Sequence, residues 1–274
     1  MNSRQLVIIT DLDGTLLDQK TYSYQACLPA IRKVQSSKIP LVLCSSKTRS
    51  EIEPLWKELK LEDPFIVENG GAIYFRPGYF PFTVENARDE GGLEKLALGQ
   101  SVKFLRHVLL DAVRRFRVHA RSFGDMRPDE IAQLTGLPRE SAWAASQREY
   151  DEPFVVDGGN AQRLFTALRT KGLKIARGDR FFHLSCGSDK GRATNELLKL
   201  YRRSNPSLVS VGIGNSANDL PLLCHVDRPV LVRNPDGSWD STVAQNLSAA
   251  RHTVNIGPEG WREAVEEILE QFRV

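Results

Sequence analysis

The alternation of apolar and polar stretches along the chain predicts a parallel sheet with helices between its strands. Residues 6–9 are all apolar and lead into the segment Thr-Asp-Leu-Asp-Gly at 10–14. An unbroken apolar run of this kind is typical of a central strand that is buried on both faces. Residues 24–37 then carry apolar side chains at helical spacing, and residues 40–44 are again apolar. The first part of the chain is therefore predicted to form a βαβ unit.

The same type of pattern returns later in the chain. An apolar strand, a glycine turn and a second strand are expected within 65–74. The later elements are predicted to be a helix from 188, strands at 207–212, 229–232 and 252–256, and a closing helix at 258–272. Together these elements predict an α/β fold with a Rossmann-like, doubly wound parallel-sheet core.

The middle of the chain has a different pattern, which predicts an inserted α/β layer. Residues 82–99 are polar and are expected to be irregular. Helices are predicted at 102–116, 127–136, 138–148 and 161–171, and strands at 116–120, 153–156, 173–176 and 180–185. Because this layer interrupts a continuous core, we predict a core domain at 1–81 and 187–274 and an inserted α/β cap domain at 82–186.

Asp11 and Asp13 are the first candidate functional residues. Side chains alternate along an extended segment, so both carboxylates leave the backbone on the same side, at the carboxyl edge of the sheet. Two like charges beside a buried strand repel each other, and a bound cation would relieve that repulsion. The alternative is an acidic turn in which Asp13 caps a helix.

Hydroxyl and cationic side chains follow the second predicted strand. Ser45, Ser46 and Lys47 precede a predicted helix at 50–59, and hydroxyls with backbone amides at a helix start form an anion site. Lys47 opposes the helix dipole at that position and needs an anionic partner. A simple serine cap is the alternative for Ser46.

Further segments are expected to reach the same edge of the sheet. Lys190 lies in the first turn of a helix that Ser188 can cap, where a cation again calls for a nearby anion; the alternative is a solvated lysine. Asn215 and Asp219 lie in a glycine-rich loop before a proline that is suited to begin a helix, and Asp219 has a helix cap as its alternative. The turn that contains Asn69 fits a site residue and an ordinary hairpin equally well.

Composition excludes several classes of protein. The 274 residues include 37 basic and 34 acidic side chains, a net charge of +3 that is too near balance to favour nucleic acid. No apolar stretch approaches the length of a membrane span, and the N-terminal residues do not have the pattern of a signal peptide. The four cysteines are scattered and fit neither a zinc site nor a disulfide framework. We therefore expect a cytoplasmic monomer or homodimer that binds neither nucleic acid nor membranes.

The order of these motifs resembles that of the haloacid dehalogenase superfamily of phosphotransferases. The Asp-Leu-Asp-Gly-Thr segment at 11–15 is similar to its nucleophile motif, and Ser45, Lys190 and the 215–219 loop are similar to the three motifs that follow. The insertion lies between the second and third motifs, as in the branch with an α/β cap. The resemblance implies an Mg²⁺-dependent phosphatase that forms an aspartyl phosphate on a small phosphorylated substrate.

Within the superfamily, the chain resembles the mannosyl-3-phosphoglycerate phosphatases. The similar segments are Ser45-Ser46-Lys47-Thr48, Glu68-Asn69-Gly70, Gly124-Asp125-Met126, Leu134-Thr135-Gly136-Leu137 and Gln147-Arg148-Glu149-Tyr150-Asp151-Glu152-Pro153. They imply that the substrate is a phosphorylated sugar-glycerate, over which the cap closes.

The resemblance also implies roles for individual residues. Asp11 is expected to be the nucleophile and Asp13 the general acid and base, while Ser45 and Lys190 hold the phosphoryl group. The expected Mg²⁺ ligands are Asp11, Asp13, Asn215 and Asp219. The expected substrate-binding residues are Ser46, Lys47, Asn69, Arg148, Arg180 and Asn218.

Two positions depart from the family pattern. Asn215 stands where the family usually has an aspartate, so a neutral amide replaces one metal carboxylate. Asp179 stands where the family tends to have a second glycine, next to Arg180, and adds a negative charge near the expected substrate. The rival functions are a phosphatase for another sugar phosphate, such as a glucosyl analogue or a sucrose phosphate, and a non-catalytic sensor of a phosphorylated ligand.

Overall fold

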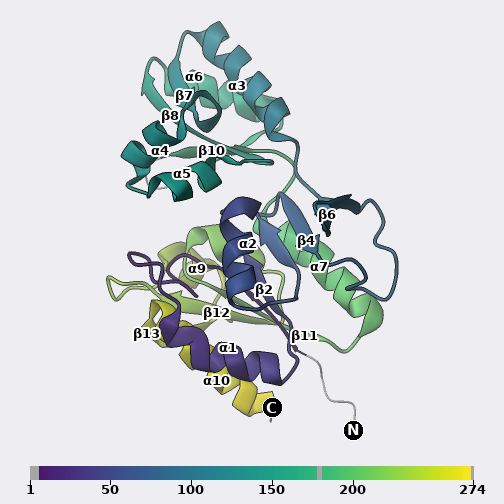
Figure 1. Ribbon diagram of the computed structural model, residues 1–274. Helices are drawn as coiled ribbons and strands as arrows, with labels where there is room; N and C mark the ends of the chain where they lie inside the picture. Colours follow the sequence, from purple (N-terminus) through teal and green to yellow (C-terminus); the bar gives the residue numbers. More distant parts are fainter. Residues whose placement is uncertain (1–5, 178–180, 273–274) are drawn as a thin grey trace.

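The computed structural model describes residues 6–177 and 181–272. Its larger part is built on a nine-stranded sheet in the order β13-β12-β11-β1-β2-β3-β4-β6-β5 (Figure 1). In that order the strands are Arg251–Ile256, Arg228–Arg233, Val209–Gly214, Leu6–Thr10, Leu41–Cys44, Phe65–Val67, Ala72–Phe75, Leu93–Ala97 and Arg88–Glu90. Neighbouring strands from β13 to β3 are parallel, and β4, β6 and β5 add to them antiparallel. The predicted doubly wound α/β fold is confirmed.

Helices cover both faces of this sheet. One face packs against α1 (Leu28–Ser36), α2 (Arg49–Glu58) and α10 (Gly257–Phe272), and the other against α7 (Lys190–Ser204), α8 (Leu220–Leu223) and α9 (Ser241–Asn246). Within β1, Leu6 and Ile8 belong to the first apolar cluster, whereas Val7 and Ile9 belong to the second. The strand is apolar without interruption because neither of its faces meets water.

The inserted segment forms a second sheet of four antiparallel strands in the order β7-β8-β10-β9. These strands are His119–Ser122, Asp151–Gly158, Phe182–Ser185 and Lys174–Arg177. On one face, α3 (Val102–Phe116) and α6 (Ala161–Thr170) bury Phe154 of β8. On the other, α4 (Pro128–Thr135) and α5 (Arg139–Ser146) pack against the following residue, Val155, and α5 also contacts α2 of the core. This layer, called the cap below, stands above the core in Figure 1.

The segment 82–99 differs from its prediction. It contains β5 and β6, which extend the nine-stranded sheet beyond β4, so the separate sheet of the insertion begins only at β7 and not near residue 82. Every residue of β5 is exposed, and Leu93 is the one fully buried side chain of β6. Strands at a sheet edge carry many charged residues and little apolar alternation, which is the signal on which strand prediction depends.

Other elements lie close to their predicted positions. The short helix α9 has no counterpart among the predicted elements, and short 3-10 turns are present at Gln25–Cys27, Phe123–Asp125 and Ala217–Asp219.

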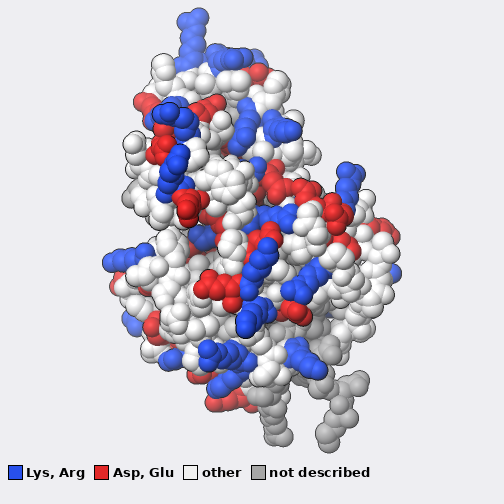
Figure 2. All heavy atoms as spheres, viewed as in Figure 1, with Lys and Arg blue, Asp and Glu red and all other residues white. Residues whose placement is uncertain are grey.

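On the surface, basic and acidic side chains are interspersed over the face seen in Figure 2. None of the helices in the described part of the chain combines the length and apolarity that crossing a membrane requires.

A buried tryptophan side chain links the last helix to the first strand by a hydrogen bond. Trp261 of α10 is completely buried, and its Nε1–H donates to Thr10 Oγ1 at 2.9 Å. The Thr10 hydroxyl in turn donates to the carbonyl oxygen of Asp11 at 2.8 Å. Because Thr10 directly precedes Asp11, this chain of hydrogen bonds fixes the backbone where β1 ends.

We expect Trp261→Phe to lower the free energy of unfolding by about 1–3 kcal/mol, because Thr10 loses a buried partner and the smaller ring leaves a cavity. Urea denaturation of the variant and the parent protein measures this difference. Trp143→Phe is the matched control, since Trp143 is 54% exposed and should change the free energy by about 0.5 kcal/mol or less. Equal losses in the two variants would contradict the role given to Trp261.

Candidate active site

The candidate site lies where three parallel strands end. β1 is hydrogen-bonded to β2 on one side and to β11 on the other. Asp11, Ser45 and Asn215 are the first residues after these strands, and all three are buried. The carboxyl ends of parallel strands meet at one edge of a sheet, and here they bring three of the predicted site residues together.

The turn that follows β1 packs directly against the loop after β11. Gly14 has a φ of +75°, and a Cβ atom at this position would lie 2.7 Å from the side-chain nitrogen of Asn215. Glycine therefore serves two needs here, the left-handed backbone and the close approach. Leu12, between the two carboxylates, is completely buried in the core.

Lys190 joins the first strand to the 215–219 loop. It is the first residue of α7 and is 1% exposed. Its Nζ donates to Asp11 Oδ1 and to Asp219 Oδ1, each at 2.6 Å. Asp189, and not Ser188 as predicted, caps this helix by accepting from the Arg192 backbone N–H. The buried ammonium group therefore has the anionic partners that its position requires.

These contacts set the electrostatics of the site. Burial and the neighbouring Asp219 carboxylate raise the pKa of Asp11 to about 7, although the Lys190 ammonium acts against them. Although burial opposes it, the pKa of Lys190 is raised above its usual range by Asp11 and Asp219. The surroundings therefore favour the charged form of Lys190 and disfavour the charged form of Asp11.

Asp13 faces a second lysine. Its Oδ2 lies 3.0 Å from Lys47 Nζ, so Lys47 finds an anionic partner at the start of α2. The Asp13 Oδ1 atom is buried and has no hydrogen-bond partner among the described residues. A buried carboxylate oxygen without a donor is unfavourable, so it fits a group that binds there from outside the chain.

The residues around Lys47 clarify the roles of the two serines. Ser45 is buried, and its Oγ accepts from the Lys47 backbone N–H at 3.2 Å. Thr48 caps α2 in a reciprocal arrangement with Glu51, so Ser46 is not the helix cap that the sequence left open. The Ser45 hydroxyl hydrogen remains free to donate to an anion at the strand end.

Polar side chains of the loop after β11 form hydrogen bonds within the loop and with neighbouring residues. Asp219 is completely buried, and its Oδ2 accepts from the backbone N–H of Asn215 at 3.0 Å and of Ser216 at 3.1 Å. The Asn215 side chain accepts from Thr15 Oγ1 at 3.1 Å and donates to Asn234 Oδ1 at 2.8 Å. Asp219 therefore closes the turn at 215–216 in addition to pairing with Lys190, and its side chain makes no capping hydrogen bond to α8, which differs from the helix cap given as its alternative.

This arrangement bears on the predicted metal ligands. Asp11, Asp13, Asn215 and Asp219 converge on one edge, but the described residues contain no group of three or more His, Cys, Asp or Glu side chains arranged to hold a metal ion. Asp219 is directed toward Lys190 and backbone amides. A direct Mg²⁺ contact from Asp219 therefore remains a prediction.

Asn234 is the site residue that the sequence analysis missed. It is the first residue after β12, the next parallel strand beyond β11, and it bonds both to the Asn215 side chain and, through its own Nδ2, to the Asn215 carbonyl oxygen at 3.2 Å. A signal was present, because Asn234 lies two residues after the predicted strand at 229–232, which ends at the same edge of the sheet.

Asn69, Asn218 and Arg148 lie on or near the boundary with the cap. Asn69 Oδ1 accepts from Asn218 Nδ2 at 2.9 Å, so two predicted substrate-binding residues contact each other. The Arg148 side chain is 7% exposed, and its guanidinium donates to the carbonyl oxygens of Ala145 and Ser46 at 2.9 and 2.8 Å. Arg180 lies outside the described residues. Arg148 is thus bound to protein groups on both the cap and the core.

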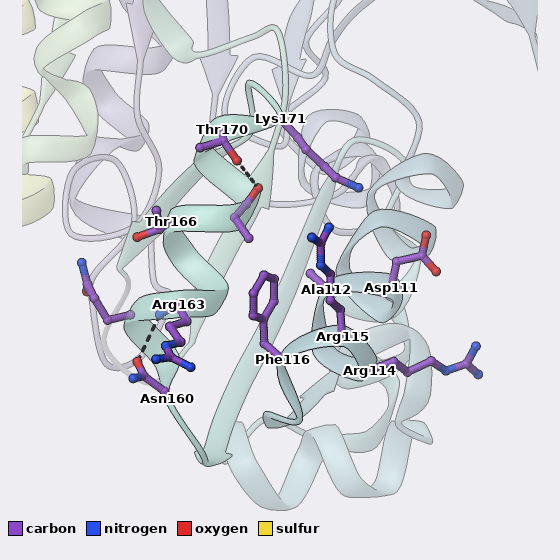
Figure 3. A pocket seen from close by; sticks show the side chains of 12 residues that line it. Asp111, Ala112, Arg114, Arg115, Phe116, Asn160, Arg163, Thr166, Thr170 and Lys171 are labelled. Atoms are coloured by element: carbon purple, nitrogen blue, oxygen red, sulfur yellow. Dashed lines mark hydrogen bonds between the residues drawn. The ribbon is translucent and has the colours of Figure 1, made fainter.

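Two hollows are relevant to ligand binding. A cavity of about 470 Å³ lies between core and cap, and its lining includes Tyr22 and Lys47 of the core and Glu140 and Ser141 of α5. A groove of about 860 Å³ lies on the cap between α3 and α6, where Arg114, Arg163 and Lys171 are seen in Figure 3. The groove contains no predicted site residue, whereas the cavity includes Lys47, the partner of Asp13.

A buried lysine between two carboxylates, at the end of a central parallel strand and under an inserted cap, defines a site suited to nucleophilic transfer of an anionic group. Residues 8–82 match the haloacid dehalogenase-like hydrolase family. In fold, the chain is similar to a haloacid dehalogenase-like hydrolase from Bacteroides thetaiotaomicron, with a TM-score of 0.67 and 21% identity over 97% of this chain and 100% of that one.

Proteins more similar in sequence have names that specify a reaction. The chain is 37% identical to a glucosyl-3-phosphoglycerate/mannosyl-3-phosphoglycerate phosphatase from Methanococcoides burtonii, over 96% of this chain and 97% of the relative. It is 34% identical to a mannosyl-3-phosphoglycerate phosphatase from Pyrococcus furiosus, over 82% of this chain and 90% of that protein. The chain therefore belongs to the haloacid dehalogenase-like hydrolases and is a phosphoric monoester hydrolase of that family.

We expect Lys190→Met to abolish phosphate release and to lower the free energy of unfolding by about 3–5 kcal/mol, because Asp11 and Asp219 would face each other without a counter-charge. Thermal and urea unfolding, together with a phosphate assay, measure the two effects. Lys199→Met on the same helix is the control, since the Lys199 side chain is 61% exposed. A Lys190 variant as stable as the Lys199 variant would show that the buried pairs contribute little.

Proposed function

We propose that this protein is an Mg²⁺-dependent phosphatase of glycosyl-3-phosphoglycerates, with mannosyl-3-phosphoglycerate as the first candidate substrate and the glucosyl analogue as the second. The observation that carries the proposal is Asp11, held by Lys190 at 2.6 Å and followed two residues later by Asp13, at the end of the central strand. The names of the relatives from M. burtonii and P. furiosus support the choice of substrates.

In the proposed reaction Asp11 is the nucleophile. Its Oδ1 accepts from Lys190, which leaves Oδ2 to attack the phosphorus atom. The new Asp11–phosphorus bond forms as the bond from phosphorus to the ester oxygen breaks, and Asp13 donates a proton to that leaving oxygen. Asp13 then takes a proton from water, which attacks the aspartyl phosphate, releases inorganic phosphate and restores the Asp11 carboxylate.

Two further residues are proposed to stabilise the phosphoryl group. The Ser45 hydroxyl and the Lys190 ammonium are fixed donors at the strand ends, and fixed donors stabilise the charge that develops on phosphoryl oxygens. Lys47 keeps Asp13 in place and adds positive charge beside it.

The residues at the site fit a divalent cation. Asp11 and Asp13 provide carboxylate and carbonyl oxygens, Asn215 provides an amide oxygen, and the buried Oδ1 of Asp13 has no hydrogen-bond partner among the described residues. Bound Mg²⁺ would offset the repulsion between the Asp11 carboxylate and a phosphate dianion. Asp219 is proposed to act mainly by holding Lys190 and the 215–216 backbone in place.

The space for the rest of the substrate is proposed to lie between core and cap. The cavity that includes Lys47, Tyr22 and Ser141 adjoins Asp13 and is lined from both parts of the chain. Asn69 and Asn218 are proposed to meet the substrate from the opposite side of the site. For Arg148 we propose a different role from the predicted substrate contact, because its guanidinium is buried against carbonyl oxygens of Ala145 and Ser46.

A phosphate-release screen tests the proposal. The panel contains mannosyl- and glucosyl-3-phosphoglycerate, sucrose phosphate and simple sugar phosphates, each with and without Mg²⁺. We expect the highest kcat/KM with a glycosyl-3-phosphoglycerate, and we expect Asp11→Asn to release no phosphate while keeping the folded circular dichroism spectrum. Preference for sucrose phosphate would replace the proposed substrate, and binding without turnover across the panel would favour a sensor.

Asn215→Asp tests the proposed cation site. An added carboxylate should strengthen the attraction for Mg²⁺, and recovery of about 1.4 kcal/mol would lower the half-saturating Mg²⁺ concentration about tenfold. Asn234 can turn its amide to donate to the new carboxylate, since it lies 2.8 Å from this side chain. An Mg²⁺ titration of both proteins measures the change, and an unchanged or higher half-saturation point would count against Asn215 as a ligand.

A further inference from the structure

The turn after β3 contains a buried carboxylate with no part in the proposed chemistry. Glu68 is 1% exposed, and both Glu68 and Asn69 adopt left-handed backbone conformations, with φ of 48° and 56°. Residues other than glycine pay a conformational penalty in this region, so the surrounding structure has to hold the turn in place. The Glu68 N–H donates to the Lys47 carbonyl oxygen at 2.9 Å, and the Asn69 N–H donates to that of Ser45 at 3.0 Å. The turn is therefore tied to the catalytic segment after β2.

The Glu68 side chain points the other way, into the cap. Its two oxygens accept from three successive backbone N–H groups: Glu149 at 2.9 and 3.1 Å, Tyr150 at 2.8 Å and Asp151 at 2.8 Å. Burial raises the pKa of Glu68 to about 7, against the opposing effects of Arg148 and of the amide donors. The carboxylate therefore supplies the acceptor for three successive backbone N–H groups, those of the two residues that precede β8 and of its first residue.

The segment that Glu68 binds lies in the cap, between α5 and β8, and it contacts the linker through which the chain passes from the core into the cap. The Glu149 carbonyl oxygen accepts from the Val102 N–H at 2.6 Å, at the point where the chain enters α3. The Tyr150 side chain packs against Gly71 of the core and Gly99 of the entering linker, and a Cβ atom at Gly71 would overlap it. The backbone N–H of Gln100, in the entering linker, donates to the carbonyl oxygen of Cys186, in the returning linker, at 3.1 Å. The 149–151 backbone thus lies at the pivot of the cap.

Side chains next to this segment reach the catalytic loops. The Arg148 guanidinium donates to the Ser46 carbonyl oxygen at 2.8 Å. Asp151 accepts from Asn69 Nδ2 at 3.4 Å, and Asn69 accepts from Asn218 of the 215–219 loop at 2.9 Å. The 149–151 backbone is therefore linked, through side chains at the boundary between cap and core, to the parts of the segment after β2 and of the loop after β11 that face the cap.

We propose that Glu68 is a positioning residue that fixes the pivot of the cap relative to the catalytic carboxylates, and so determines how well the cap covers a large phosphorylated substrate. The effect on turnover rests on the proposed phosphatase function, whereas the clamp on residues 149–151 does not. Glu68 touches neither the reacting atoms nor their ligands, and it acts through the backbone that it holds.

Glu68→Gln is the variant that tests this role. Glutamine has the same reach, but one of its terminal groups is a donor and cannot accept from the amides of 149–151. We expect kcat/KM for mannosyl-3-phosphoglycerate to fall by about tenfold to a hundredfold, because the cap would hold this substrate in a less favourable position. We expect kcat/KM for p-nitrophenyl phosphate to change little, since this small ester does not need the cap. Amide hydrogen exchange at 149–151 should become faster.

Glu152→Gln is the matched control. Glu152 is also completely buried, but its partners Arg106 and Gly124 belong to the cap alone. This variant should lower stability without changing the ratio of the two kcat/KM values. If Glu68→Gln lowered kcat/KM for both substrates by the same factor, as substitution of a merely structural residue would, the positioning role would be wrong.

The two proposals fail in different ways. If the parent protein released no phosphate from any compound of the panel, the proposed function would fail, while the exchange experiment would still support or refute the clamp. Unchanged exchange at 149–151 in Glu68→Gln would refute the clamp even in an active enzyme. If Glu68→Gln did not fold, Glu68→Asp, whose carboxylate is shorter by one methylene, would be measured in its place with the same expected directions.

Discussion

The arrangement of the site depends on the buried ammonium group of Lys190. An ion of this kind is stable inside a protein only when counter-charges meet it at hydrogen-bond distance, because removing it from water is costly. Its two partners, Asp11 and Asp219, come from different parts of the chain and lie 179 and 29 residues away. These contacts therefore require the end of β1, the loop after β11 and the first residue of α7 to lie next to one another. The cap is inserted between two of these elements, so its two linkers must return close to each other.

Much of this convergence could be predicted from the sequence. The strands around Asp11, Ser45 and Asn215 are apolar runs that end in polar residues, and parallel strands align such ends at one edge. Lys190 stood out because a cation at a helix start requires an anion. The orientation of Asp219 toward backbone amides could not be foreseen, since a loop aspartate can equally face a metal ion, a lysine or its own turn. The edge strands β5 and β6 were missed because exposed strands lack the apolar alternation that marks buried ones.

The turn that contains Asn69 shows why the sequence left two roles open. It joins β3 to the antiparallel β4, as an ordinary hairpin turn does, and it also contacts the catalytic loop through Asn218. Local pattern reveals the first role only. The second depends on Glu149, Tyr150 and Asp151, about eighty residues further on, whose amides turn toward the Glu68 carboxylate. Their segment resembles a known family, but the resemblance alone does not say that its backbone, rather than its charged side chains, is what the core recognises.

The balance of charge at the site gives a reason for the neutral amide of Asn215 among the predicted metal ligands. Three carboxylates, those of Asp11, Asp13 and Asp219, face two ammonium groups, those of Lys47 and Lys190, so one negative charge is in excess. Burial and this excess are consistent with the raised pKa of Asp11. In the proposed reaction a phosphate dianion would add two more negative charges beside Asp11, and a bound divalent cation would offset them. A further carboxylate at 215 would bind that cation more tightly but would also increase the repulsion toward the phosphate. In that proposal the neutral Asn215 would offer the cation an amide oxygen without adding to the negative charge that the substrate must approach.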